Sequence, residues 1–238
     1  KGSEFYTLHV RDTDANADLA DNVADTGGSG AWDATNSGFF YTRLDPNHRP
    51  SRIYYHPLGK KRDRLIYEEK DPGFFMNVGG SLTNNWIFIA IHDHETSEYR
   101  ILPANDPHAK PRLMAAREAG LQYDPEDGGD VFFILTNADG AKDFKVMTAP
   151  VSDPGRANWR EFIPHESGRL ILSVMAFHDF LVRLERKEGL PRIVIRDRAS
   201  GEEHVIAFEE EAYSLGLSGA YEYDTDTIRL SYSSLTTP

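Results

Sequence analysis

Acidic and amide side chains near the N-terminus alternate with a spacing that suits a hard cation. Asp12, Asp14 and Asn16 stand at every second position, as ligands do at the start of a calcium-binding loop. The rest of that motif is missing, because Ala17 stands where the loop needs glycine and Val23 where it needs the closing glutamate. We therefore expect a solvent-exposed hairpin here, with a cation site as the weaker alternative.

Histidines offer a second set of metal-ligand types. His92-Asp93-His94 places two imidazoles around one carboxylate, and both kinds of group are common metal ligands. No third ligand and no second histidine pair with a metal-site spacing accompanies them. We therefore expect a surface turn at residues 92–94, and we interpret His9, His56 and His204 as ordinary strand residues.

The sequence signatures of phosphate binding and of serine catalysis are both incomplete. Gly27-Gly28-Ser29-Gly30 is glycine-rich, but neither the lysine nor the helix that completes a phosphate-binding loop follows it. We expect it to be a loop that leads into a strand. Ser29 and Ser218 have glycine neighbours at the wrong spacing for the Gly-x-Ser-x-Gly turn of a serine hydrolase.

Carboxylates gather in two further segments, Asp124-Pro-Glu-Asp-Gly-Gly-Asp130 and Glu209-Glu-Glu211. A pair of carboxylates performs the acid–base chemistry of glycosidases, but the pairing depends on a separation in space that the sequence does not give. We interpret both segments as solvated loops. No residue is assigned as catalytic, cofactor-binding or metal-binding, and no cofactor is expected.

These segments lie between apolar runs that repeat along the chain. Strand-like runs begin near Phe39, Ile87, Val131, Phe180 and Ile228, a period of about 45 residues. Such repeats are typical of β-propeller blades, because one four-stranded sheet buries its faces only against neighbouring sheets. The sequence therefore predicts an all-β fold, a β-propeller built of four-stranded antiparallel blades.

We expect a single propeller domain over residues 1–238. The predicted units are an outer half-blade at 4–22, whole blades at 28–71, 74–118, 121–167 and 169–213, and an inner half-blade at 214–238. Together they make about five blades. Because exposed strand edges invite aggregation, we expect Phe5–Val10 to pair with Ile228–Ser233 and close a five-bladed ring. An open arc whose ends are covered by a second copy, in a dimer, is the alternative.

Composition restricts the partners. The 26 basic and 38 acidic residues give a net charge of −12, so nucleic acid is excluded as a main partner because its phosphates would be repelled. Cysteine is absent, which excludes disulfides and thiolate catalysis. Without a signal peptide or a run of about 18 apolar residues, we expect no membrane partner and a cytoplasmic location, although the periplasm is not excluded.

The two ends of the sequence suggest a larger protein. The chain starts at Lys1 without a methionine and stops at Pro238 inside a strand-rich pattern. We expect it to be a piece of a longer polypeptide.

Four segments also carry a family resemblance. They are Leu65-Ile-Tyr-Glu-Glu-Lys-Asp71, Thr96-Ser-Glu-Tyr-Arg-Ile-Leu102, Trp159-Arg-Glu-Phe-Ile-Pro164 and Tyr232-Ser-Ser-Leu-Thr-Thr-Pro238. In their order and spacing they resemble the propeller of the oligopeptidase B group, also called protease II, in the prolyl oligopeptidase family of serine peptidases. The resemblance runs along nearly the whole chain.

This resemblance implies a parent enzyme that cleaves short peptides after Lys or Arg, with a seven-bladed propeller over its catalytic cleft. The family's catalytic triad, oxyanion hole and main basic-residue pockets belong to an α/β-hydrolase domain, and none has a matching position here. The expected partners are that missing domain of the same polypeptide and short basic peptides. We expect the chain alone to be inactive, and its role to be gating of the cleft.

Two other classes of function stay open from the sequence. A stand-alone binding propeller would use loops on one face of the ring to hold a ligand or protein. A propeller glycosidase would need inward carboxylates that converge on the axis.

Overall fold

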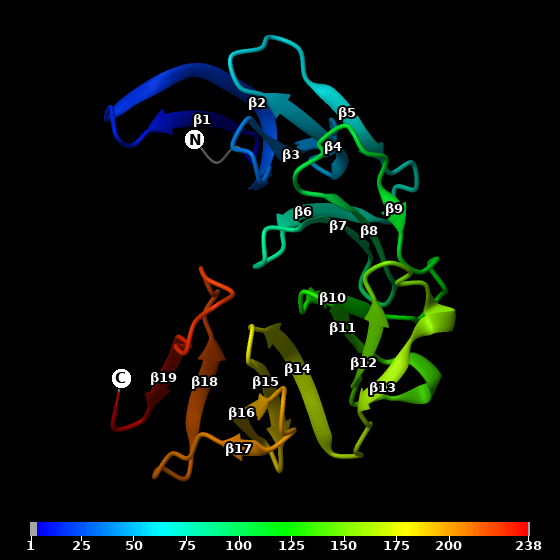
Figure 1. The fold of residues 1–238 in the computed structure, drawn as a ribbon, viewed down its shortest axis with the longest axis vertical. Coiled ribbons are helices and arrows are strands. Elements are labelled where there is room, and N and C mark those ends of the chain that lie inside the picture. The colour runs from blue at the N-terminus through cyan, green and yellow to red at the C-terminus, as the bar shows by residue number, and fades with distance from the viewer. Residues whose placement is uncertain (1–3, 238) are drawn as a thin grey trace. The chain divides into compact units, whose positions relative to one another are not determined.

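The computed structural model describes residues 4–237, and strands make up nearly all of its regular structure (Figure 1). Within each sheet, strands pair antiparallel with their neighbours in sequence. Two single-turn 3-10 helices, Ala138–Gly140 and Arg156–Asn158, lie beside the strands. No helix within residues 4–237 has the length and apolarity needed to cross a membrane. The chain divides into two compact units, residues 1–120 and residues 121–238.

The first unit begins with a five-stranded sheet. Its strands, in sheet order, are β1 (Tyr6–Asp12), β2 (Ala17–Trp32), β3 (Gly38–Leu44), β4 (Pro50–Pro57) and β5 (Arg64–Glu68). The long strand β2 joins the N-terminal hairpin to the strands that follow, so residues 4–22 and 28–71 belong to one sheet.

The glycine-rich segment is not the loop that the sequence suggested, since it lies inside β2. The pairing of β2 with β3 shifts between Thr26 and Gly30, which is a bulge in the strand. Gly28 has a φ of +84°, and a Cβ on Gly27 would lie 2.8 Å from Oγ1 of Thr42. Glycine is needed here for both reasons.

The bulge lets the N-terminal hairpin cover one face of β3. Val10 of β1 and Val23 of β2 form a small core with Phe39 and Tyr41. Phe40, between Phe39 and Tyr41 on β3, points to the other face of the sheet and packs in a larger core. Strand β3 is therefore buried on both faces, which agrees with its almost continuous run of apolar residues.

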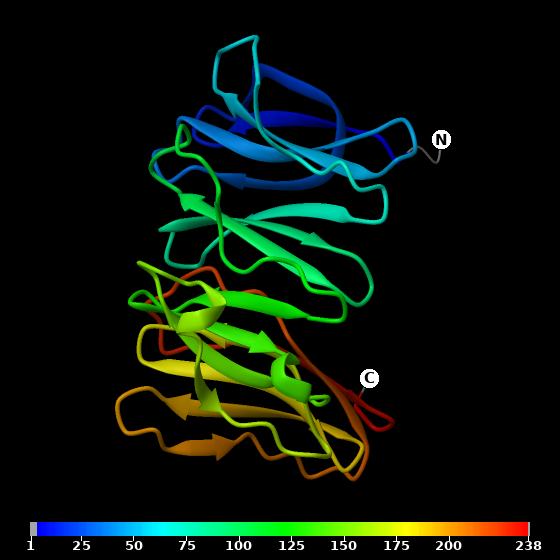
Figure 2. The same ribbon diagram turned by 90° about the vertical axis from the view of Figure 1, so that its right-hand side faces the viewer.

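The second sheet of this unit contains β6 (Phe75–Gly80), β7 (Trp86–His92), β8 (Ser97–Pro103) and β9 (Arg112–Leu113). In β7 every second residue is buried, as the alternation in the sequence predicts. Figures 1 and 2 show this sheet beside the first. The core between the two sheets consists of Phe40, Ile53, Tyr55, Met76, Val78, Ile87, Ile89, Ile91, Leu102 and Ala104.

The second unit contains two four-stranded sheets and one two-stranded sheet. The first has β10 (Tyr123–Asp127), β11 (Val131–Thr136), β12 (Lys145–Pro150) and β13 (Arg160–Ile163). The second has β14 (Arg169–Ala176), β15 (Phe180–Lys187), β16 (Leu190–Asp197) and β17 (Glu203–Val205). The last has β18 (Tyr213–Leu217) and β19 (Leu230–Ser234).

A core between the two four-stranded sheets holds this unit together. It consists of Phe133, Leu135, Val146, Ile163, Ile171, Ala176 and Leu181. The predicted all-β fold with four-stranded antiparallel blades is therefore confirmed. The closure of a ring stays a prediction.

Candidate functional site

The segment with calcium-like spacing forms the turn between β1 and β2. Asp12 accepts hydrogen bonds from the backbone amides of Asp14 and Ala15, at 3.0 and 2.9 Å. Arg11 pairs with Asp18 at 2.6 Å and donates to the side-chain oxygen of Asn16 at 2.7 Å. The carboxylates at the two ends of this turn therefore serve the hairpin itself.

His92 is the last residue of β7, and the turn that the sequence predicted at residues 92–94 begins after it. Asp93 accepts hydrogen bonds from the amides of Glu95 and Thr96, and Nε2 of His92 lies 3.2 Å from the side-chain nitrogen of Asn77. His9 and His204 are exposed strand residues. Within residues 4–237, no group of three or more His, Cys, Asp or Glu side chains is arranged to hold a metal ion.

The two serines with glycine neighbours lie in strands or beside them. Oγ of Ser29 contacts Oγ1 of Thr42 at 3.0 Å across the bulge of β2, and the amide of Ser218 donates to the carbonyl of Arg229. Neither position is a strand-to-helix turn of the kind that exposes a nucleophile.

The two acidic segments are more ordered than solvated loops. Residues 123–127 form strand β10, and the turn after it is tied by Arg198, which donates to the carbonyl of Gly128 and to Asp130, both at 3.0 Å. In the other segment, Glu210 accepts hydrogen bonds from Tyr232 and Thr236. Asp130 therefore joins two turns, and Glu210 joins a turn to strand β19.

His56 lies in a strand, as the sequence predicted, but it is not an ordinary strand residue. It lies on β4 and is buried, between two carboxylates. Its Nε2 is 2.9 Å from Oδ1 of Asp21, and its Nδ1 is 2.7 Å from Oδ1 of Asp63. A neutral imidazole can donate from only one nitrogen, so contacts with two carboxylates favour the doubly protonated cation.

The two carboxylates have further donors. Oδ1 of Asp21 also accepts from the backbone amide of Gly59 at 2.6 Å, and Oδ2 of Asp63 accepts from the hydroxyl of Tyr41 at 2.6 Å. His56 therefore links β2 of the N-terminal hairpin with the loop between β4 and β5. Sequence reasoning missed this site because Asp21 is 35 positions away from His56 and no local pattern connects them.

The contacts of His56 shift its own pKa and that of Asp21. Burial alone lowers the pKa of His56, but the hydrogen bonds with Asp21 and Asp63 outweigh it, so the pKa of His56 is raised. The hydrogen bond from His56 in turn lowers the pKa of Asp21, against the effect of burial. Both shifts favour the charged forms of His56 and Asp21.

A pocket of about 450 Å³ opens beside this cluster. It is lined by residues 20–24 of β2, by Arg43 and His56, and by Gly59, Lys60, Lys61 and Asp63 of the β4–β5 loop. The pocket thus combines a buried, charged histidine with several cationic side chains.

A second charged cluster ties the two sheets of the first unit together. Arg117, after β9, pairs with Glu69 after β5 and with Glu98 on β8. Its guanidinium also lies 4.0 Å from the ring centre of Phe74, a favourable cation–π distance. Glu69 and Glu98 are both buried, so each needs the cation that Arg117 supplies.

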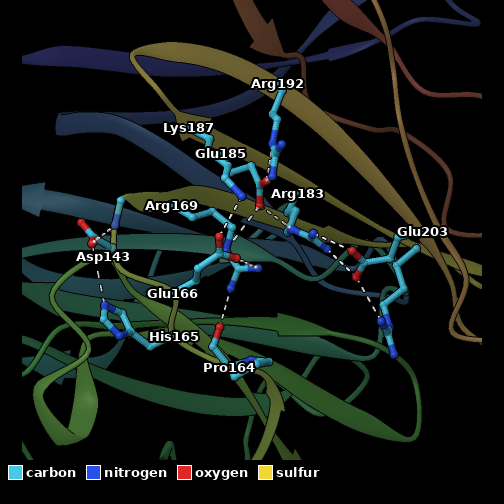
Figure 3. A network of polar contacts seen from close by, with 12 residues as sticks. Asp143, Pro164, His165, Glu166, Arg169, Arg183, Glu185, Lys187, Arg192 and Glu203 are labelled. Atoms are coloured by element: carbon cyan, nitrogen blue, oxygen red, sulfur yellow. Dashed lines mark hydrogen bonds and ion pairs between the residues drawn. The ribbon is translucent and has the colours of Figure 1, made fainter.

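A further charged network lies in the second unit, around β14–β17 (Figure 3). Glu185 on β15 has no exposed surface. Figure 3 shows three arginines around it: Nε of Arg183 donates at 2.7 Å, Arg192 forms a short ion pair, and Nε of Arg169 lies at 3.9 Å. One buried carboxylate therefore faces three guanidinium groups.

The same network continues to the edge strand β17. Arg183 makes a two-pronged contact with Glu203, with both nitrogen–oxygen distances at 2.7 Å, and Arg196 donates to Glu203 at 3.0 Å. The hydrogen bonds from Arg183 lower the pKa of Glu203 to about 2, although partial burial opposes this. These contacts fix the short outer strand to its blade.

Comparison with known proteins places the chain in a family. The family model described as the N-terminal β-propeller domain of prolyl oligopeptidase matches residues 1–238. The chain belongs to the prolyl oligopeptidase family. Within this family its sequence is 34% identical to dipeptidyl aminopeptidase BI of Pseudoxanthomonas mexicana and 30% identical to protease 2 of Moraxella lacunata. Both matches cover 100% of the chain, but only 33% and 34% of the relatives.

Solved structures of the prolyl oligopeptidase family support the same family assignment. Oligopeptidase B from Leishmania major matches 99% of the chain with a TM-score of 0.92 and 27% identity, and the match covers 35% of that protein. Oligopeptidase B from Trypanosoma brucei, with covalently bound antipain, matches 92% of the chain with a TM-score of 0.87 and 30% identity, over 33% of its length. The chain therefore spans about a third of the length of the relatives that it matches.

Proposed function

We propose that this chain is the substrate-gating propeller of a serine oligopeptidase that cleaves short peptides after Lys or Arg. The observation that carries the proposal is the match of the propeller-domain model to residues 1–238, together with the fact that the chain covers only about a third of its relatives. The remainder of such a polypeptide would supply the catalytic hydrolase domain.

The preference for basic residues has narrower support. Protease 2 and the two oligopeptidase B structures are 27–30% identical to the chain, whereas the relative at 34% identity carries the name of a dipeptidyl aminopeptidase. The net charge of −12 is compatible with attraction of cationic peptides by long-range steering.

A gate must keep its shape while substrates are sorted by size. Arg117 joins two sheets in the first unit through Glu69 and Glu98. In the second unit, Arg183 joins β15 to the edge strand β17 through Glu203. Buried ion pairs of this kind favour one arrangement of the strands, because a shifted strand would leave a charge without its partner. Strands held in one arrangement in this way are compatible with a gating role.

The test uses the full-length polypeptide that contains this chain. Fluorogenic peptides with Arg, Lys or Pro before the cleaved bond would be compared by kcat/KM, beside a folded protein with exposed lysines. We expect the Arg and Lys peptides to exceed the Pro peptide by about tenfold or more, and the folded protein to stay intact. The isolated chain serves as the control and should hydrolyse none of them.

Three outcomes would contradict separate parts of the proposal. Cleavage of the folded protein at the rate of the peptides would remove the gating role. Release of N-terminal dipeptides without a preference for Arg or Lys would favour the activity named for the Pseudoxanthomonas relative. Hydrolysis by the isolated chain, abolished by a serine-directed inhibitor, would show that a catalytic serine lies within these 238 residues.

A further inference from the structure

The loop between β4 and β5 carries an unusual concentration of positive charge for so acidic a chain. Lys60, Lys61, Arg62 and Arg64 lie within five consecutive positions. Within residues 4–237 these four side chains form no ion pair with an acidic group, and the two lysines line the pocket beside His56. The loop therefore contributes positive charge that the fold does not neutralise.

Arg43 brings a further cation to the same pocket from β3. Its guanidinium lies 4.5 Å from the ring centre of Tyr54, and its side chain is 31% exposed. Its nearest acidic atom is Oδ2 of Asp63, at 3.7 Å, which is too long for a hydrogen bond. Within the described residues the guanidinium donates no hydrogen bond, and its Nε is enclosed without an acceptor.

The acidic groups of the pocket are already engaged elsewhere. Asp21 accepts from His56 and from the amide of Gly59. Asp63 accepts from His56 and from Tyr41. Neither carboxylate forms a hydrogen bond with Arg43 or an ion pair with the lysines, so these three side chains keep their donors for another acceptor.

A charge count indicates what that acceptor would be. Four cations line the pocket, namely Arg43, His56, Lys60 and Lys61, against the two carboxylates of Asp21 and Asp63. The difference, 4 − 2, leaves two positive charges. A partly enclosed guanidinium combined with two exposed ammonium groups suits a compact anion with several oxygens. The volume of about 450 Å³ lies within the range of small-ligand sites.

We propose that this pocket is a binding site for a compact phosphate-type anion that carries two or more negative charges. In this site Arg43 contacts one group of oxygens from β3, and Lys60 and Lys61 contact the ligand from the loop. Because the loop also presents the amide of Gly59 to Asp21, an occupied site would steady the contact between the N-terminal hairpin and the blade. The site is independent of peptide cleavage.

Isothermal titration of the 238-residue chain with inorganic pyrophosphate tests the proposal. We expect one site with a Kd below about 1 mM and a rise in the melting temperature as pyrophosphate is added. The double variant Lys60→Ala/Lys61→Ala should weaken binding by about tenfold or more. Arg43→Lys keeps the charge but loses the planar fork, and it should weaken binding by several-fold.

A matched control removes two exposed lysines elsewhere in the first unit. Lys70→Ala/Lys110→Ala changes the net charge equally and should leave the Kd within about twofold. Equal weakening by both double variants would mean attraction by net charge alone and would overturn the site. So would the absence of binding at 10 mM pyrophosphate, a concentration of about ten times the expected Kd.

A second probe tests the chemical class. Citrate, compared at matched pH and ionic strength, carries carboxylates instead of phosphates. Weaker binding of citrate than of pyrophosphate supports the phosphate assignment, whereas equal or tighter binding of citrate overturns it.

Discussion

Asp21 and His56 are 35 positions apart in the sequence, and their side chains meet at 2.9 Å inside the first unit. His56 simultaneously contacts Asp63 at 2.7 Å, so one imidazole joins the N-terminal hairpin to the loop after β4. All three side chains are largely buried. The hairpin is thus attached to its blade by charge as well as by the apolar contacts of Val10 and Val23.

Replacement of His56 by alanine should destabilise the chain. The change leaves the carboxylates of Asp21 and Asp63 buried without their shared cation, and loss of one partner from a buried ionic cluster costs about 3 kcal/mol. The free energy of unfolding from urea denaturation measures this effect. His9→Ala, at an exposed position of β1, is the control and should stay within about 0.5 kcal/mol of the wild type. Equal stability of the two variants would contradict a structural role for His56.

The contribution of His56 should also depend on pH in a defined direction. Its pKa is raised above 6.5 in the folded state, so its stabilisation is present below pH 6.5 and is lost as pH rises through the folded pKa. The pKa of Asp21 is lowered below 3.8, so its stabilisation is present above pH 3.8 and is lost as pH falls through the folded pKa.

The difference in unfolding free energy between wild type and His56→Ala should therefore be greatest between about pH 4 and pH 6.5, and should shrink in more alkaline buffer. Denaturation curves at several pH values provide the measurement. A difference that grows steadily up to about pH 9 would show that the cationic form of His56 is not the one that stabilises the fold.

Glu185→Gln should weaken the second unit. The carboxylate of Glu185 is fully buried among Arg169, Arg183 and Arg192, and an amide would remove the negative charge that these three guanidinium groups share in the interior. We expect a loss of about 3 kcal/mol, measured by urea denaturation. Glu202→Gln, on the exposed turn before β17, should change stability by less than about 0.5 kcal/mol. If Glu185→Gln left the free energy of unfolding unchanged, the arginines would be held by packing alone.

The sequence predicted the sheets well because their signals are local. Alternating burial in β7 follows directly from alternating side chains. The course of β2 was not predictable in this way. Its glycine-rich segment resembles a loop, yet pairing with β3 across a bulge keeps it in the sheet.

The polar clusters escaped prediction because their members are distant in the chain. His56 has a partner 35 positions away and Arg117 one that is 48 positions away, so only the stacking and pairing of strands brings them together. The basic run at residues 60–64 was visible in the sequence, but its position beside Arg43 depends on the turn after β4. Charge patterns alone do not reveal such neighbours.

Glu126→Gln is expected to stabilise the chain at neutral and alkaline pH. Burial, reinforced by the charge of Asp124, raises the pKa of Glu126 on β10 to about 8. The folded state therefore holds a proton that the unfolded chain releases near pH 4.5, and stability is lost as pH rises between these values. Glutamine has no proton to lose, so the variant should gain on the order of 4 kcal/mol near pH 8 and almost nothing near pH 4.

Parallel denaturation curves of wild type and Glu126→Gln at these two pH values provide the measurement, with the exposed Glu209→Gln as a control. A variant that is less stable than the wild type at both pH values would show that Glu126 is ionised and paired in the folded state.

The closure of the ring is open to a direct chemical test because the chain contains no cysteine. If β1 shares a blade with β19, the exposed residues Thr7 and Ser231 lie on neighbouring strands. The double variant Thr7→Cys/Ser231→Cys should then form an intramolecular disulfide under mild oxidation, since paired strands bring some Cα atoms within about 6 Å of each other. Further double variants, such as Thr7→Cys/Ser233→Cys, would test other alignments of β1 with β19.

Non-reducing electrophoresis and intact mass spectrometry would distinguish the outcomes. A monomer that is two mass units lighter supports the closed ring, because two thiols lose one hydrogen each when they join. Each single-cysteine variant is a control for random collisions, and it should give little dimer at low protein concentration. A disulfide-linked dimer that forms only in the double variants would support pairing between two copies. Failure of every neighbouring pair to cross-link, with both thiols accessible to a small maleimide, would mean that the two edges stay apart in solution.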